Sequence, residues 1–145
     1  MLITGYGQMD AEHAFTRATR ARRRAALART LLRRRPGTCG RLAVVDAACR
    51  AAGVPRGASE IPLDAIRATL EPSRAAQFDS EFRPADGVTR TRWQRLWLAR
   101  QRGAVLPPVS VVALDDGYAL RDGHHRVSVA RAQGALTIDA IVDAG

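Results

Sequence analysis

Lysine is absent from the 145-residue sequence, and only two residues are cysteine. Cys39 and Cys49 form no CxxC pair, so we expect neither a disulfide framework nor a cysteine zinc site, and a reducing compartment fits best. No apolar run approaches the roughly 18 residues that span a bilayer. The first residues have neither the basic nor the apolar region of a secretion signal. These absences predict a cytoplasmic protein that makes no membrane contact.

Arginine supplies all 23 basic residues, and the formal net charge is +9 at pH 7. The charge is concentrated in residues 1–41, which hold ten arginines against Asp10 and Glu12. Because arginine binds phosphate through paired hydrogen bonds, the clustering favours a nucleic acid or an acidic protein as partner. A genome rich in G and C would also raise arginine and alanine usage, and composition alone does not separate the two explanations.

The N-terminal part of the chain reads as helical. Residues 10–35 contain neither proline nor glycine and are rich in alanine, arginine and leucine, which predicts a long helix with a narrow apolar stripe. Residues 42–52 predict a second short helix that ends at Gly53. We therefore expect residues 1–57 to form a basic helical extension and residues 58–145 to form the domain itself.

The rest of the sequence mixes strand and helix patterns. Residues 61–66 predict a short edge strand that passes into a turn, because Pro62 is tolerated only at an edge, whereas residues 67–86 show no regular pattern. Residues 88–102 predict a helix that places its tryptophans in the core. The remaining expected elements are a hairpin over residues 108–121, a helix over 123–133 and a strand over 136–142. The predicted fold class is α+β, a small mixed sheet with helices preceded by an arginine-rich helical arm.

The most informative segment is Asp-Gly-His-His-Arg at residues 122–126, where a predicted strand passes directly into a predicted helix. Asp122 suits an N-cap, Gly123 allows close approach of the backbone, and the free N–H groups of the first turn attract an anion. His124, His125 and Arg126 would add side-chain donors to a phosphate. A purely structural helix start, with solvated histidines, explains the same residues equally well.

No metal centre is expected. Adjacent histidines point about 100° apart on a helix, and the third histidine, His13, is far away in the sequence. The sequence also shows no carboxylate cluster for two metal ions, which argues against a nuclease.

At these residues the sequence resembles the N-terminal domain of ParB, within the ParB/sulfiredoxin superfamily. The resemblance runs from Leu-Pro-Pro-Val at residues 106–109 through residues 122–126 to Ile-Asp-Ala at residues 138–140. Residues 61–66 and the following Arg74 resemble the first strand and the arginine box of that domain. The resemblance implies a ParB/sulfiredoxin-like fold over residues 60–142 that holds nucleotide phosphates at the motif, with CTP or ATP and Mg²⁺ as the expected cofactor.

The motif departs from the pattern of each relative. Sulfiredoxins carry Gly-Cys-His-Arg, and since His124 stands at the cysteine position, their repair chemistry is not expected. ParB partition proteins carry Gly-Glu-Arg-Arg, so CTP hydrolysis by their usual route is not expected either. The motif is closest to that of relatives that phosphorylate free serine. Such an activity needs a carboxylate base, for which Glu71 and Asp122 are the candidates.

The sequence thus predicts a ParB-like protein that binds a nucleotide or phosphate and associates with DNA. The phosphate contacts are expected at Asp122, Gly123, His124, His125, Arg126 and Arg74. The DNA contacts are expected on the helical arm, at Arg20, Arg23, Arg24 and Arg34. Two alternatives stay open: an NTP-dependent small-molecule kinase, and a non-catalytic dimerisation or interaction module that forms a homodimer.

Overall fold

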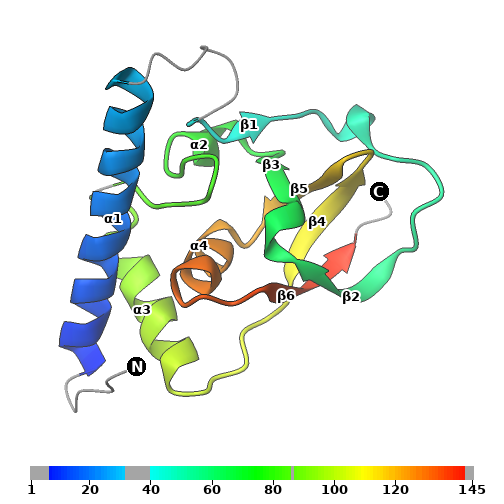
Figure 1. Cartoon of the computed structure of the whole chain (residues 1–145). Coiled ribbons are helices and arrows are strands. Elements are labelled where there is room, and N and C mark those ends of the chain that lie inside the picture. Colours follow the sequence, from blue (N-terminus) through cyan, green and yellow to red (C-terminus); the bar gives the residue numbers. More distant parts are fainter. Residues whose placement is uncertain (1–6, 32–39, 86, 143–145) are drawn as a thin grey trace.

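The computed structural model describes residues 7–31, 40–85 and 87–142, in which a mixed sheet of six strands packs against helices. The elements are α1 (Gly7–Leu31), β1 (Ala43–Val44), the 3-10 helix η1 (Ala47–Cys49), β2 (Gly57–Pro62), the 3-10 helix η2 (Leu63–Ala65), β3 (Ile66–Thr69), α2 (Pro72–Ala75), α3 (Arg90–Gln101), β4 (Val109–Leu114), β5 (Gly117–Asp122), α4 (His124–Ala132) and β6 (Thr137–Val142). Figure 1 shows α3 and α4 between the sheet and α1, which is the outermost element. The predicted α+β class is confirmed.

The strand order is β1-β3-β5-β4-β6-β2. Strands β4 and β5 form the predicted hairpin, closed where Leu114 pairs with Gly117. The expected edge strand is found in part: β2 lies at one edge and pairs antiparallel with β6, but it ends at Pro62, so residues 63–65 of the predicted strand form η2 and Ile66 begins β3. Proline is tolerated there because a strand at the edge leaves one row of N–H groups unpaired.

Helix α4 is held from two sides. Val127 and Ala130 belong to the main core, together with Val109 and Leu120 of the central strands. Val129, on the other side of α4, packs against the helix layer. Because both sides of the helix are buried, its first turn is fixed relative to the sheet.

A second core joins α1 to α3. Phe15 and Trp93 are both 0% exposed, and their rings meet edge to face with centroids 5.4 Å apart. The Trp93 Nε1–H donates to Ser128 Oγ of α4 at 2.8 Å, and Trp97 is also buried. The predicted placement of both tryptophans in the core is confirmed. Helix α1 is therefore docked along its first half, while the expected domain boundary at residues 57 and 58 stays a prediction.

Two sequence predictions of local structure are wrong. Residues 42–52 form β1 and η1 instead of a helix: β1 pairs in parallel with β3, and the Asp46 carboxylate accepts from the Ala48 N–H at 2.8 Å. Residues 67–86 are not wholly irregular, because they include most of β3 and all of α2. Strands β1 and β3 are so short that pairing with neighbouring strands, rather than a sequence pattern, decides their conformation.

The predicted long helix is present as α1, although it begins earlier than expected, at Gly7. Its expected last turn, residues 32–35, lies outside the described residues. Among the helices that are described, none is both long and apolar enough to cross a membrane.

Candidate functional site

The junction between β5 and α4 is built around Gly123. Its backbone is left-handed, with φ of +106° and ψ of 23°. A Cβ atom added at this position would lie 2.5 Å from Val109 Cγ1, so the junction requires glycine. The helix cap is Gly123, and the prediction that Asp122 caps the helix is wrong. The left-handed residue turns the chain between Asp122 and the helix, and the carboxylate instead contacts Arg126 at 3.2 Å.

The first turn of α4 leaves backbone donors available. The Val127 N–H bonds to the Gly123 carbonyl at 2.9 Å. Within the described ranges, the N–H groups of His124, His125 and Arg126 donate to no other protein group. These three donors sit at the positive end of the helix dipole, which favours an anion.

A cavity of about 220 Å³ opens at this helix end. The motif residues 122–126 line it together with Arg74 from α2 and Arg92 from α3. The structure thus brings the predicted contact Arg74 to the motif from a separate element. Arg92 was missed by the sequence analysis, because it is one of several arginines on the exposed side of α3 and only the packing of α3 on α4 brings it here.

Thr69 holds His124 in place. The His124 side chain is buried, and its Nε2 lies 2.6 Å from Thr69 Oγ1. The Thr69 hydroxyl also accepts from the Glu71 N–H at 2.9 Å. The Phe78 ring stacks on the imidazole, with centroids 6.2 Å apart. His124 is therefore a fixed wall of the cavity, supported by Thr69, whose segment shows no regular pattern in the sequence.

His125 is 6% exposed and also lines the cavity. Its ring meets the edge of Phe78 at a centroid distance of 5.2 Å, and it forms no hydrogen bond with any of the described residues. A buried imidazole without a protein partner, at the wall of a cavity, is a polar group that a bound ligand can satisfy.

Both imidazoles are neutral at pH 7. Burial lowers the pKa of His124 to about 4, with a further lowering by Arg74. Burial likewise lowers the pKa of His125 to about 4, assisted by Arg92 and then Arg74. The positive charge of the cavity therefore comes from its arginines and its backbone dipoles.

These depressed pKa values predict a loss of stability in mild acid. Between about pH 6.5 and pH 4 the unfolded chain binds protons that the folded chain does not, so the free energy of unfolding should fall as pH decreases. Each imidazole contributes roughly 1.4 kcal/mol per pH unit in that window. Urea denaturation across the window measures the slope. His125→Asn should flatten it, whereas His13→Gln, which removes an exposed imidazole, should not, and equal slopes in all three proteins would contradict the assignment.

Arg126 acts as a clamp on the neighbouring loop. Its Nη1 donates to the carbonyl oxygens of Pro107 at 2.6 Å and Pro108 at 2.9 Å, and its Nη2 donates to Asp122. The sequence suggests bidentate binding of a phosphate by Arg126. Such binding would require these hydrogen bonds to break. Direct binding of phosphate by Arg126 stays a prediction. In the structure, Arg126 shapes the cavity by holding the loop at Pro107.

The two candidate bases differ in position. Asp122 lines the cavity, but its carboxylate is 73% exposed and paired with Arg126. Glu71 is exposed and does not line the cavity. Over the described ranges, no three side chains of the metal-ligand types come together.

The structure describes three of the four arginines that the sequence predicts as DNA contacts. Arg20, Arg23 and Arg24 are exposed on α1, whereas Arg34 lies outside the described residues. Their role in DNA binding stays a prediction.

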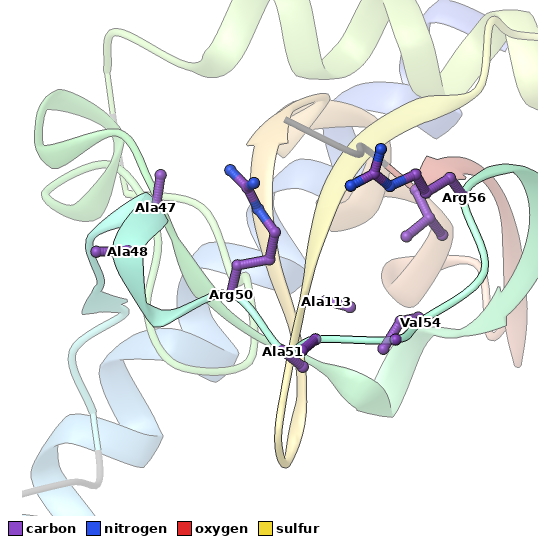
Figure 2. A pocket seen from close by; sticks show the side chains of 10 residues that line it. Ala47, Ala48, Arg50, Ala51, Val54, Arg56 and Ala113 are labelled. Atoms are coloured by element: carbon purple, nitrogen blue, oxygen red, sulfur yellow. The ribbon is translucent and has the colours of Figure 1, made fainter.

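A second cavity, of about 580 Å³, lies beside the segment that contains η1. Figure 2 shows the guanidinium groups of Arg50 and Arg56 extending to the same side of this segment, over Ala51, Val54 and Ala113. Apart from the two arginines, the described residues that line this cavity are alanine, glycine and valine. We place the candidate site at α4 because imidazoles, free backbone donors and arginines coincide there.

The similarity of this chain to known proteins is distant. No protein-family model matches the chain, and no curated protein does. Among solved structures, the chain is similar to sulfiredoxin from Arabidopsis thaliana, with a TM-score of 0.45 and 20% identity, over 61% of this chain and 85% of that chain. The resemblance to the N-terminal domain of ParB stays a prediction. A likeness this distant carries neither activity nor ligands from one protein to the other.

Proposed function

We propose that the cavity at the start of α4 binds the phosphate group of a nucleotide or of another phosphate ester. One observation carries the proposal: Arg74 and Arg92 converge from two elements on the three free N–H groups of α4. Among the described residues that line the cavity, the one acidic side chain, Asp122, is paired with Arg126. The site therefore offers donors and positive charge to an anion.

The size of the cavity indicates how much of the ligand it holds. At about 220 Å³, it is smaller than the roughly 300–1,000 Å³ typical of pockets that enclose a whole small molecule. A phosphate group fits inside, and the remainder of a nucleotide would extend over the rim. CTP and ATP with Mg²⁺ remain the expected nucleotides.

Thermal unfolding with inorganic phosphate, sulfate, ADP, ATP, CTP and GTP, with and without Mg²⁺, tests the proposal. A ligand present at a hundred times its dissociation constant should stabilise the fold by about 2.7 kcal/mol. Arg92→Gln should remove most of the shift, because Arg92 lines the cavity. Arg95→Gln, an exposed position of the same helix outside the cavity, is the matched control. No shift with any ligand, or equal loss in both variants, would contradict phosphate binding here.

Binding is proposed in preference to phosphoryl transfer. A kinase needs a base within hydrogen-bond reach of the acceptor hydroxyl. Glu71 does not line the cavity, and the Asp122 carboxylate is held by Arg126. An NTP-dependent kinase would show Mg²⁺-dependent turnover that Arg92→Gln abolishes.

We also propose that the exposed side of α1 contacts DNA. Its other side is docked on α3 through Phe15, which leaves Arg20, Arg23 and Arg24 facing solvent. Each phosphate contact should lower the logarithm of the binding constant by about 0.9 per tenfold increase in salt. Fluorescence anisotropy with a labelled duplex at several salt concentrations measures the slope, which Arg20→Gln should reduce. Binding that does not respond to salt would contradict this proposal.

A further inference from the structure

A groove separate from the phosphate cavity runs between α1 and the body of the protein. Its volume is about 440 Å³, and it is lined by α1, by the turn at residues 81–84 and by the later part of α4. The α1 side presents the small residues Ala14, Ala18 and Ala21. Opposite them lie Phe82 and Pro84, which are both buried. The accessible apolar surface of the groove, its floor, is therefore a strip of small side chains, Ala18 and Ala21 of α1 and Ala132 of α4.

Arginines stand along both sides of this groove. Arg17 and Arg24 come from α1, seven positions apart and so on the same side of the helix, and Arg83 and Arg131 come from the opposite side. Arg83 is paired with Asp79 and Glu81, and Arg131 donates to the Leu63 carbonyl at 3.2 Å. These bonds fix the guanidinium groups of Arg83 and Arg131 on the side of the groove opposite α1.

The α1 side of the groove is not neutralised. Among the described residues, no carboxylate pairs with Arg17 or Arg24, and the single acid in the lining, Glu81, is already bonded to Arg83. The groove thus combines an apolar floor with two guanidinium groups that lack a counter-charge.

The wall opposite α1 is preformed. The buried Asp79 carboxylate accepts from the Glu81 N–H at 3.0 Å and from the Arg83 N–H at 2.8 Å. These bonds hold the turn that places Phe82 at a left-handed φ of 59°. A partner would not need to order this wall, which lowers the cost of binding.

From this juxtaposition we infer that the groove binds a segment of a partner protein in which acidic and apolar residues alternate. Carboxylates would pair with Arg17 and Arg24, and the apolar side chains would lie on the alanine floor. A second copy of this chain is disfavoured, because two molecules with a net charge of +9 repel each other. Single-stranded nucleic acid is disfavoured too, because bases stack on accessible aromatic rings and Phe82 is 1% exposed.

The test uses fluorescence anisotropy with the full chain and three labelled probes: a peptide of alternating glutamate and leucine, a polyglutamate peptide and a single-stranded DNA. The Glu-Leu peptide should bind more tightly than polyglutamate, because only the former uses the apolar floor. Arg17→Gln combined with Arg24→Gln should weaken its binding by at least about tenfold, the loss expected for two charge-assisted contacts. The matched control is Arg95→Gln combined with Arg102→Gln, which removes the same charge at exposed positions outside the groove and should change binding by less than about twofold.

The outcomes separate the alternatives. Equal weakening by both pairs of substitutions would show attraction by overall charge and overturn the inference. Tighter binding of the single-stranded DNA that is lost with Arg17→Gln alone, a groove residue outside the proposed DNA contacts, would assign the groove to nucleic acid and overturn the inference as well. Ala21→Gln, which fills the floor without changing charge at a position outside the second core, supplies a second test: it should weaken binding of the Glu-Leu peptide and leave that of polyglutamate unaffected, and an unchanged affinity for both would contradict the docking mode.

Discussion

Phe15→Ala is expected to lower the free energy of unfolding by about 3–5 kcal/mol. Phe15 lies on α1, far in sequence from the sheet, yet it is 0% exposed and meets Trp93 edge to face. The substitution would leave a void between α1 and α3 and remove one side of the second core. Urea denaturation followed by circular dichroism measures the loss.

Leu27→Ala is the matched control for this prediction. Leu27 lies on the same helix but is 58% exposed, so its truncation should change stability by no more than about 0.5 kcal/mol. A comparable, small effect of both substitutions would mean that α1 is not docked on α3 in solution. The groove proposed for the acidic partner would then have no fixed wall on that side.

Gly123→Ala should cost about 2–5 kcal/mol and abolish phosphate binding. The left-handed backbone contributes about 1–2 kcal/mol for any residue with a Cβ. The clash with Val109, whose Cγ1 would lie 2.5 Å from the new atom, adds about 1–3 kcal/mol. Relief of the clash must move β4 away from the start of α4, which displaces the donors of the proposed site. Denaturation and phosphate-induced thermal shifts measure the two effects.

Gly134→Ala separates the two contributions. Gly134 also has a left-handed backbone, with φ of +75°, but an added Cβ would meet nothing within 4 Å. Its replacement should therefore cost only the backbone contribution. Combining Gly123→Ala with Val109→Ala should cost less than the sum of the two single substitutions, because loss of Val109 Cγ1 removes the closer of the two contacts, while the Cβ of residue 109 stays 2.8 Å from the new atom. Equal costs at the two glycines would contradict the close packing of the junction.

The sequence predicts the elements with strong local signals. The turn at residues 115–117 has the chemistry of a tight hairpin, and β4 and β5 form that hairpin. The spacing of Trp93 and Trp97 gives the buried side of α3 correctly. Helix α4 is also found where the glycines at either end place it. In each case, neighbours in the sequence decide the conformation.

Elements and site residues that depend on distant partners could not be predicted in this way. Strand β1 has two residues and exists through its pairing with β3. Thr69 reaches His124 across fifty-five positions of the sequence, and Arg92 reaches the cavity only because α3 packs on α4. The Asp122 side chain has two local uses, as a helix cap or as the partner of Arg126. The left-handed Gly123 selects the second.

An NMR titration of the isotopically labelled chain with inorganic phosphate tests the proposed phosphate site most directly, because it follows each donor separately. The backbone amides of His124, His125 and Arg126 should show the largest shift changes, together with the side-chain Nε–H of Arg92. Arg92→Gln should weaken the titration, and Arg95→Gln should leave it unchanged. Shift changes confined to the arginines of α1, with the first turn of α4 unaffected, would contradict a phosphate site at this helix.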